Sequence, residues 1–485
     1  MTSRIEDEPA WERVRLEWKL RCLSPMHIGN GEVATYRHPN ESAEDTRKKG
    51  NETEYQTLDI CRGDNGLPLI PASSLRGHLL HKIQGDEHDE IRARLFGTAR
   101  NESEGGSGKV RVYDGLLSLD GNQGSDISAT ELRTRIAIDP ITATAKRNHL
   151  FTETHVCKDS CFVIHIECDR ISKNDLQVLY SILASLNGTA GSQLGKGKTL
   201  LKGLVKTLSI QAKALSHVDF VEWLKEDKEL DNYYKKLDLG PSEHGIKAQL
   251  QGPAFHLKIH PTAPLLINDI HRVSGKSGEA DHVFMSENGR LMIPASSLKG
   301  LLRGHCRRIL LTLMDSLSER VKTEAPKAYT PHQNVDELLE EIFGSTQQIG
   351  RIRISDALSE KKATIHEQTF NAIDRFTGGV SDGALYMSRA GWAESLSMNL
   401  ILDASIKDQS WIQGLLHLVL RDAMEGDLRI GWGKSRGYGA FRLSVTLKER
   451  EIDNWKDWLN EQGAGKVKEA VSALEDKLKP PEEDA

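Results

Sequence analysis

The chain has 485 residues and a mass of 54.0 kDa, with 38% hydrophobic and 28% charged residues and a formal net charge of −6. This length exceeds that of a single hydrophobic core and predicts more than one domain. No apolar run approaches the roughly 20 residues that span a bilayer, and the first residues lack the apolar stretch of a secretory signal. We therefore expect a cytoplasmic protein without a membrane role. The acidic balance disfavours a general nucleic-acid binder unless basic groups gather on one face.

The predicted elements occur twice and in the same order. Alternating strands open the two copies, at Leu16–Leu23 and Phe255–His260. A polar stretch from Glu32 to about Thr57 follows in the first copy, where its composition predicts a long, mobile loop. Residues 271–280 form the shorter counterpart in the second copy.

Each polar loop ends in an aspartate, Asp59 in the first copy and Asp281 in the second. Both aspartates stand just ahead of the strand that leads into the next repeated motif. Counting back strictly from the proline of that motif leads instead to the neighbourhood of Gln56 and Glu279. The pairing of the two aspartates is thus a hypothesis about register.

The repeated motif is an octapeptide: Ile70–Gly77 (IPASSLRG) returns as Ile293–Gly300 (IPASSLKG). An extended entry, two serines suited to N-capping and a helical run predict a strand-to-helix corner. The corner is either purely structural, or it is a phosphate seat made of hydroxyls, free N–H groups and the positive end of a helix dipole. The candidate phosphate-binding residues are Ser73, Ser74 and Arg76 in the first copy and Ser296, Ser297, Lys299 and Arg303 in the second.

The next elements complete each copy. Strands with one basic face end in Asp114 and Asp356, and two extended arms around a polar tip predict protruding hairpins at about 133–156 and 368–390. A further strand, an apolar helix and a last strand follow. The order strand, helix, strand, strand, helix, strand predicts an α+β protein made of two ferredoxin-like (RRM-like) modules with antiparallel sheets.

A glycine-rich segment closes each copy. Glycine lets a backbone approach a phosphate closely, and the lysines and arginines supply positive charge. A Walker motif is excluded, because it needs glycine where Ser192 and Leu428 stand. The candidate RNA-binding residues here are Gly195, Lys196, Gly197 and Lys198 in the first copy and Gly431, Gly433, Lys434, Ser435, Arg436 and Gly437 in the second.

Four segments of the chain follow from this repeat. We predict a first module over residues 14–210 and a second over 250–448. A helical appendage and linker at 211–249 separates the modules, and a C-terminal helix with an acidic tail occupies 449–485.

The combination of a GxGKSRGYG segment, an IPxSSL[RK]G corner, an acidic residue before it and an IDxxTG hairpin resembles the RAMP (repeat-associated mysterious protein) superfamily. In particular, the chain looks like a tandem fusion of two backbone subunits of the Cas seven type from type III CRISPR effector complexes, in a III-D-like arrangement. The resemblance covers residues of about 14–210 and 250–448. Each motif is weakly specific, but four motifs in the same order, twice, form a strong signal.

The resemblance implies a role for each motif. The corners and glycine-rich segments would grip the guide RNA (crRNA) backbone, and the hairpins would be thumbs that wedge into the guide–target duplex. The loop acids Asp59 and Asp281 would hold a divalent metal, Mg²⁺ or Mn²⁺, for cleavage of target single-stranded RNA. Other Cas subunits of a prokaryotic effector complex would be partners. The implied thumb residues are Ile138, Asp139, Thr142, Phe151, Ile373, Asp374, Thr377 and Tyr386.

The family's context around the acid is blurred in this chain, which reads TLDICRGD in one copy and EADHVFMSE in the other. Either copy could be catalytically silent, and Asp281 is favoured because its loop is shorter and closer to the family pattern. Three alternatives stay open: a scaffold without chemistry, a metal-independent endoribonuclease that processes precursor guide RNA, and an RNA-binding protein unrelated to CRISPR. The second would need a general base, for which His27 is the only candidate.

Overall fold

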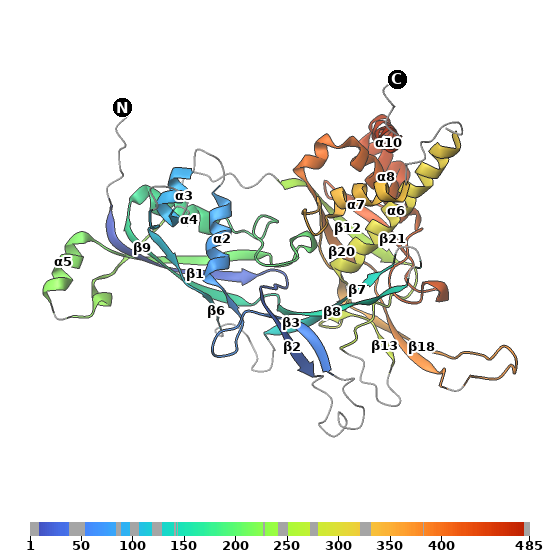
Figure 1. Ribbon diagram of the computed structural model, residues 1–485, viewed down its shortest axis with the longest axis horizontal. Coiled ribbons are helices and arrows are strands. Elements are labelled where there is room, and N and C mark those ends of the chain that lie inside the picture. Colours follow the sequence, from blue (N-terminus) through green and yellow to red (C-terminus); the bar gives the residue numbers. More distant parts are fainter. Residues whose placement is uncertain are drawn as a thin grey trace.

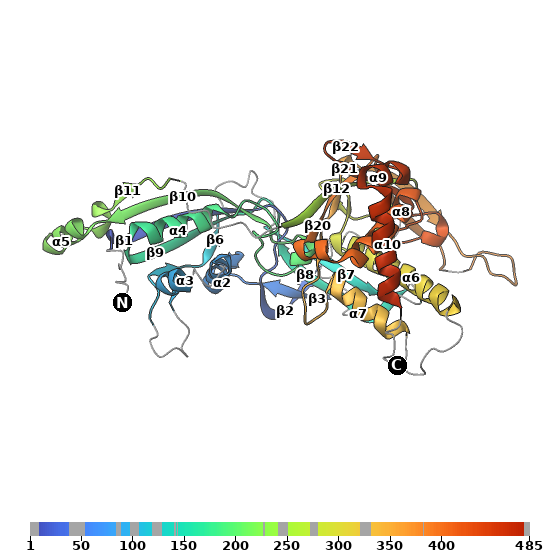
Figure 2. The ribbon, with the colours of Figure 1, turned by 90° about the horizontal axis from the view of Figure 1, so that it is seen from above.

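The computed structural model describes residues 9–37, 54–83, 89–97, 106–118, 129–139, 142, 144–226, 228–240, 251–271, 280–320, 331–381 and 383–479. Two bodies lie side by side along the long axis of the molecule, the first module at one end and the second at the other (Figures 1 and 2). Among the described helices, none combines the length and the apolar character needed to cross a membrane.

The first module has the strand order of a ferredoxin-like fold. Its βαββαβ core consists of β1 (Trp11–Cys22), α2 (Ala72–Lys82), β6 (Gly115–Leu117), β9 (Cys161–Ile171), α4 (Lys173–Ala184) and β10 (Val205–Leu215). The sheet runs β10-β1-β9-β6, so that the first and third core strands are central. Short strands extend the sheet at its edges: β4 (Leu69–Ile70), β5 (Val110–Val112) and β11 (Lys235–Leu237).

The second module repeats this plan. Its core consists of β12 (Gln251–Pro261), α6 (Ala295–Arg320), β17 (Ala357–Lys362), β20 (Leu396–Asp403), α8 (Ser410–Glu425) and β21 (Phe441–Leu447). The sheet order β17-β20-β12-β21 is the same order as in the first module. The additional strands are β14 (Ser286–Glu287), β15 (Arg290–Ile293), β16 (Ile352–Ile354) and β22 (Arg450–Ile452). The predicted α+β class with two ferredoxin-like modules is confirmed.

Alternating burial explains why these segments form sheets. In β1, Leu16, Trp18 and Leu20 are buried on one face while the intervening residues stay partly exposed. The buried residues fall into two separate clusters, one drawn from residues 14–214 and the other from residues 257–478. Each module thus has a core of its own.

Helices cover the sheets and extend both modules. The remaining helical elements are α3 (Asp89–Phe96), η3 (Lys198–Leu200), α5 (His217–Lys225), η4 (Leu230–Tyr233), α7 (Pro331–Phe343), η5 (Ala404–Asp408), η6 (Lys434–Arg436), α9 (Trp455–Gln462) and α10 (Ala464–Leu478). A Cβ added at Gly414 in α8 would lie 2.2 Å from the carbonyl oxygen of Ala470 in α10. The C-terminal helix therefore packs directly on the second module.

Each thumb belongs to a small sheet of its own. β7 (Thr130–Ile138) pairs with β8 (Ala145–Val156) in a sheet of order β2-β3-β8-β7, together with β2 (Gly29–Arg37) and β3 (Glu54–Ile60). β18 (Thr364–Phe370) and β19 (Tyr386–Trp392) form the second thumb, with β13 (His282–Val283) beside β19. In Figure 1, β7 and β8 reach from the first module toward the second.

The prediction of one long loop from Glu32 to Thr57 is wrong at both ends. β2 continues to Arg37 and β3 begins at Glu54, while residues 38–53 lie outside the described part of the chain. Thr57 and Leu58 of β3 pair in parallel with Thr152 and Glu153 of β8. Because this pairing joins residues almost 100 positions apart, local composition does not reveal it.

The prediction that serines cap the octapeptide helices is also wrong. Pro71 occupies the N-cap position of α2 and makes no side-chain cap. The first helical N–H group instead donates to an aspartate of the following strand segment: Ala72 N to Asp114 Oδ1 at 2.6 Å, and Ala295 N to Asp356 Oδ1 at 2.7 Å. A carboxylate at a helix N-terminus satisfies a free donor and interacts favourably with the helix dipole.

An ion cluster centred on Asp356 joins the two modules. Lys202 Nζ, which follows η3 of the first module, donates to Asp356 Oδ2 at 2.6 Å, and Arg133 of β7 lies 3.7 Å away. The side chains of Asp356, Lys202 and Arg133 are only 12%, 6% and 10% exposed. Lys299 of α6 adds a bond to Thr199 Oγ1 at 3.0 Å. We call this contact the intermodule seam.

The charges of the seam depend on one another. Burial alone would raise the pKa of Asp356, but the attraction of Lys202 and Arg133 outweighs it and lowers the pKa to about 2. The carboxylate is thus ionised at neutral pH, and its stabilising contribution is lost only as the pH falls below about 4 toward 2.

We predict that Asp356→Asn lowers the free energy of unfolding by about 3 kcal/mol at pH 7, because Lys202 is left buried and unpaired. The double variant Lys202→Met/Asp356→Asn should lose clearly less than the sum of the single losses. Urea unfolding of the full chain measures both quantities. Asp114→Asn is the matched control. The asparagine oxygen can still accept the N–H at the start of α2, and the substitution leaves no buried lysine without a partner. If Asp114→Asn and Asp356→Asn lowered the free energy of unfolding equally, the proposed stabilising role of the seam would be wrong.

Candidate functional site

The glycine-rich segment packs on the turn that follows the first strand in each module. Lys196 N donates to the carbonyl of His27 at 2.9 Å, and Trp432 N donates to that of Leu266 at 2.7 Å. Gly203 N and Gly439 N bond the carbonyls of Pro25 and Pro264, both at 2.9 Å. These matched bonds make His27 the counterpart of Leu266 and Lys196 the counterpart of Trp432.

This packing explains two of the glycines. Gly195 and Gly431 have φ values of +78° and +88°, and an added Cβ would lie 2.3 Å from the carbonyl oxygen of His27 and 2.4 Å from that of Leu266. Their glycine character is therefore required by the protein's own backbone, not by a phosphate. Gly437, with φ +84°, has no atom within 4 Å of an added Cβ, so its backbone is open to a ligand.

The register of the thumb sheets decides which residue matches Asp281. Cys61 N bonds the carbonyl of Ile28 just as Met285 N bonds that of Ile267, which makes Cys61 the counterpart of Met285. Counting back four residues from Cys61 and from Met285 gives Thr57 and Asp281, which therefore occupy equivalent positions in the two modules. The predicted pairing of Asp59 with Asp281 is therefore off by two residues.

The strand partners give the same answer. Met26 bridges Val156, and Leu265 bridges Gly391, so Thr152 of β8 corresponds to Met387 of β19. Thr57 pairs with Thr152, and the backbone N–H of Asp281 donates to the carbonyl of Met387. Thr57 is buried and its hydroxyl lies 3.2 Å from that of Thr154. The first module thus has no carboxylate where the second has Asp281.

The two candidate catalytic carboxylates have different surroundings. Both oxygens of Asp59 accept hydrogen bonds from the Arg62 guanidinium at 3.1 Å. Burial would raise the pKa of Asp59, but Arg62 and the backbone N–H of Ile60 hold it below its ordinary value. Asp281 is exposed, and its Oδ2 accepts the N–H of Met387 at 2.8 Å. Asp281 is therefore anchored at the root of the second thumb and faces solvent.

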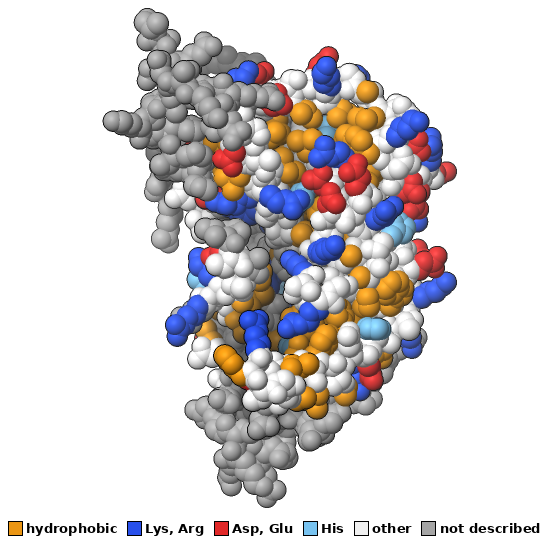
Figure 3. Space-filling model, turned by 90° about the vertical axis from the view of Figure 1, so that its right-hand side faces the viewer, with side chains coloured by type: hydrophobic (Ala, Val, Ile, Leu, Met, Phe, Trp, Pro, Cys, Tyr) orange, Lys and Arg blue, Asp and Glu red, His pale blue; other side chains and the backbone are white. Residues whose placement is uncertain are grey.

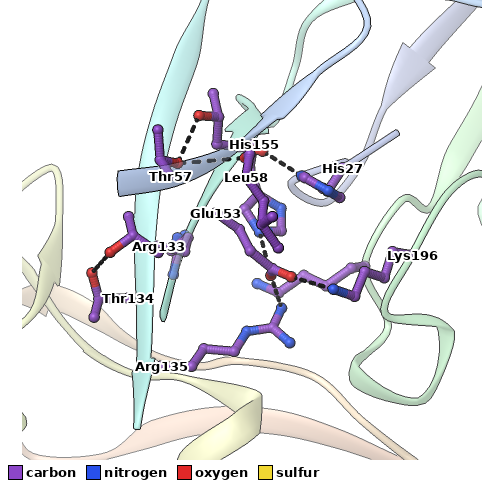
Figure 4. A network of polar contacts seen from close by, with 12 residues as sticks. His27, Thr57, Leu58, Arg133, Thr134, Arg135, Glu153, His155 and Lys196 are labelled. Atoms are coloured by element: carbon purple, nitrogen blue, oxygen red, sulfur yellow. Dashed lines mark hydrogen bonds and ion pairs between the residues drawn. The ribbon is translucent and has the colours of Figure 1, made fainter. Parts of the chain in front are cut away.

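A charged cluster occupies the root of the first thumb (Figure 4). Glu153 of β8 is fully buried, with Lys196 Nζ 2.6 Å from one carboxylate oxygen and Arg135 2.9 Å from the other. His155 Nε2 lies 3.4 Å from the second oxygen, and its ring lies 5.4 Å from that of His27. Burial would raise the pKa of Glu153, but His155, Arg135 and Lys196 hold it well below its ordinary range.

An aromatic cluster occupies the same place in the second module. Phe370 stacks on Tyr386 at 5.2 Å between ring centroids, and Trp432 lies edge-on to both. The Arg436 guanidinium lies 5.2–5.9 Å from the centroids of these three rings. The ring of His282, next to Asp281 in the chain, is 4.8 Å from that of Trp432. Three partly exposed rings and a cation thus lie next to His282, the chain neighbour of Asp281.

The predicted cations of the octapeptide helices already contact protein groups. Arg76 donates to the carbonyl of Phe96, and Arg303 to that of Gly344 at 3.3 Å. Lys299 lies in the seam, where burial and the charge of Arg303 lower its pKa to about 8. Ser73 is exposed, whereas Ser74, Ser296 and Ser297 are partly buried. Because Asp114 and Asp356 occupy the helix N-termini, a phosphate seat at these corners finds little support.

The tips of the thumbs combine a polar turn with exposed apolar side chains. Thr142 N donates to Asp139 Oδ1 at 2.9 Å, and Thr377 N to Asp374 Oδ1 at 2.8 Å, so these predicted thumb residues form the turns. Phe376 is 98% exposed. Among the described residues of the thumbs, the other exposed large apolar side chains are Ile136, Ile138, Leu150, Phe151, Ile365, Ile373, Val380, Leu385 and Trp392.

Positive charge gathers near the second thumb. Lys434, Ser435, Arg436 and Gly437 of the glycine-rich segment are exposed, as is Lys198 of the first segment. Figure 3 shows Lys and Arg side chains around a hollow on the end of the molecule formed by the second module. A net acidic chain thus carries a local cluster of positive charge around this hollow, although acidic side chains lie elsewhere on the same face (Figure 3).

A divalent metal fits Asp281 better than Asp59. Among the described residues, no group of three or more His, Cys, Asp and Glu side chains comes together to form an all-protein metal site. Mg²⁺ is often held by one or two carboxylates together with water and substrate phosphates, which the exposed Asp281 carboxylate allows. The Asp59 carboxylate is bonded through both oxygens to Arg62, so a metal at Asp59 would have to share or displace that ion pair.

The sequence reasoning missed several residues that the structure brings together. The missed residues are Asp114, Arg133, Arg135, Glu153, His155, Lys202, Asp356, Trp432 and Tyr438. Asp114 and Asp356 carried a usable signal, because they end two matched strands directly before Gly115 and Ala357. The thumb-root residues carried none, because the two modules place different residue types there.

Comparisons with known proteins agree with this repeated architecture. A family model described as the RAMP superfamily matches residues 19–206 and 263–442. The two matched regions coincide with the two ferredoxin-like modules. No curated protein matches the chain.

We predict that His155 makes the chain less stable as the pH falls. Burial, reinforced by the charges of Lys202 and Arg135, lowers the pKa of His155 to about 4, against about 6.5 for an unfolded histidine. The unfolded state therefore binds more protons between pH 6.5 and 4, and about 3 kcal/mol of stability is lost across that window.

Urea midpoints between pH 7.5 and 4 test this prediction. His155→Ala introduces the residue that Ala390 provides at the equivalent position of the second module. This variant should reduce the dependence of the urea midpoint on pH. A smaller slope should remain from His78, whose pKa burial also lowers to about 4. An unchanged slope in His155→Ala would show that His155 is not the group responsible.

Proposed function

Because this chain belongs to the RAMP superfamily over both of its modules, we propose that it is a crRNA-binding backbone subunit of a type III CRISPR effector whose second module cleaves target RNA. The family implies a CRISPR-associated RNA-binding subunit, and it includes ribonucleases. The finer assignment is supported chiefly by one observation, the exposed Asp281 carboxylate anchored at the root of a thumb beside an aromatic cluster.

The geometry suggests how target RNA is handled. Apolar thumb tips suit a wedge between stacked bases, and the partly exposed rings of Phe370, Tyr386 and Trp432 suit a displaced base. Arg436, above these rings, and the open backbone at Gly437 suit the adjoining phosphate. These contacts ignore base identity, as a backbone subunit requires when the guide supplies the sequence.

Asp281 is the proposed ligand of a divalent cation, Mg²⁺ or Mn²⁺. When bound, the cation would promote attack of a ribose 2′-OH on the adjacent phosphate, which yields a 2′,3′-cyclic phosphate and a free 5′-OH. The bond from Met387 N fixes the Asp281 carboxylate relative to the thumb. The position of the thumb in the duplex would then determine the cleaved bond and hence the regular spacing of cuts.

We expect Asp281→Asn to slow target cleavage by about 100-fold or more, because a metal ligand contributes several kcal/mol to the transition state. Binding of guide and target should be unchanged. The measurement is the cleavage of labelled target RNA by the guide-loaded complex with Mg²⁺. Asp59→Asn is the matched control and should retain cleavage. Loss of activity in Asp59→Asn with full activity in Asp281→Asn would reverse the assignment.

A specific observation supports a second activity in the first module, metal-independent processing of precursor guide RNA. His27, Asp59 and Lys196 line a cavity of about 360 Å³. His27 Nδ1 lies 2.7 Å from the carbonyl of Thr154, and since a carbonyl only accepts, Nδ1 carries the proton. The lone pair of Nε2 is then available for general-base work.

If His27 is this base, His27→Gln should reduce cleavage of precursor guide RNA in EDTA by about 100-fold. Asp281→Asn should leave that reaction intact, which separates the two activities. Product mapping on a labelled precursor supplies the measurement. Absence of any cleavage by the unmodified chain in EDTA would dismiss this second function.

A further inference from the structure

The intermodule seam is a head-to-tail contact between two different surfaces. The donor surface belongs to the first module and presents Arg133 from the thumb and Lys202 from the end of the glycine-rich segment. The acceptor surface belongs to the second module and presents Asp356 at the octapeptide corner. In a heterologous contact of this kind, each module of a repeat retains one surface that the partner module does not cover.

The uncovered acceptor surface lies on the first module. Asp114 accepts the N–H of Ala72 just as Asp356 accepts that of Ala295, and each aspartate immediately precedes a core strand. Asp114 is exposed, whereas the side chain of Asp356 is only 12% exposed beneath its two cations. Among the described residues, no cation lies within ion-pair distance of Asp114. The same carboxylate is thus paired in one module and open in the other.

The uncovered donor surface lies on the second module, where neutral residues replace the two cations that Arg133 and Lys202 provide in the first module. Gln368 lies opposite Ser388 in the thumb as Arg133 lies opposite Glu153, so Gln368 replaces Arg133. Tyr438 directly precedes Gly439 as Lys202 precedes Gly203, so Tyr438 replaces Lys202.

The two replacements bond each other: Tyr438 Oη donates to Gln368 Oε1 at 2.7 Å, and Tyr438 is buried. The exposed cations of this segment do not substitute for them. Lys434 and Arg436 correspond in sequence to Lys198 and Leu200, neither of which pairs with Asp356. Within the described part of the chain, a second copy therefore offers no cation at the two positions that match Arg133 and Lys202.

We propose that the Asp114 corner is a docking site for a different protein, one that presents a lysine or arginine on a turn as Lys202 does, and that the chain does not polymerise through this corner. The inference depends on charge complementarity and the internal seam, not on the proposed RNA cleavage. It holds whether or not Asp281 is catalytic.

Sedimentation of the purified full chain tests the self-association part of this proposal. The unmodified chain should be monomeric, and Gln368→Arg/Tyr438→Lys, which restores the two cations, should associate head to tail at least about tenfold more tightly. Adding Asp114→Asn should abolish the gain. Association of the unmodified chain that Asp114→Asn removes would overturn the proposal, as would a folded double variant that stays monomeric.

The single variant Gln368→Arg provides a version of the test that leaves the buried Tyr438 in place. Gln368 is exposed on its strand, and although the change removes the acceptor of the Tyr438 hydroxyl, Ser388 Oγ remains 3.3 Å from that hydroxyl. This variant should show a smaller gain in association that also depends on Asp114. If the Gln368→Arg chain folds well but shows no Asp114-dependent gain in association, the comparison of the Asp114 corner with the intermodule seam would be wrong.

Carbodiimide cross-linking of the complex purified with its partners tests the identity of the occupant. The reagent joins a carboxylate to a lysine amine, so the Asp114 carboxylate should become linked to a lysine of another polypeptide. Asp114→Asn should lose both this link and that polypeptide. A link from Asp114 to a second copy of the chain, or a composition unchanged in Asp114→Asn, would refute the assignment.

Discussion

One buried carboxylate, that of Asp356, holds the molecule in its arrangement. It caps α6 through Ala295 and binds Lys202 and Arg133 of the first module at the same time. Leaving any of these groups unpaired in the interior would be costly, because a buried charge needs a partner. The first thumb, the first glycine-rich segment and the second octapeptide corner are therefore held together, and the two modules act as one unit.

The repeat explains why the two modules are alike, and the thumb roots show where they have diverged. Glu153, His155 and Lys196 in the first module stand where Ser388, Ala390 and Trp432 stand in the second. Ion pairs support the first thumb, whereas stacked rings support the second. Rings that are partly exposed can serve a nucleobase as well as the fold, while the two cations at the first root, Arg135 and Lys196, both bind the Glu153 carboxylate. This difference is why the proposed cleavage belongs to the second module.

Much of the fold could be predicted from the chain itself, because the signals were local and appeared twice. Alternating strands, an apolar helix such as α4 and the duplicated IPASSL motif identify the ferredoxin-like modules. The corner was misassigned for a physical reason. Ser73 and Ser74 are plausible caps, but the free N–H of Ala72 instead donates to the carboxylate of Asp114, which is more than 40 residues away in the chain.

The sequence by itself determined the duplicated α+β plan, the RAMP resemblance and the candidate acid Asp281. Only the tertiary structure decided that Thr57, not Asp59, is the counterpart of Asp281. Side chains alternate along a strand with a period of two, so Thr57 and Asp59 share a face and a sequence pattern does not distinguish them. The parallel pairing of β3 with β8 sets the register. In the same way, contact between the modules, and not composition, made Asp356 a buried ion partner and left Asp114 open.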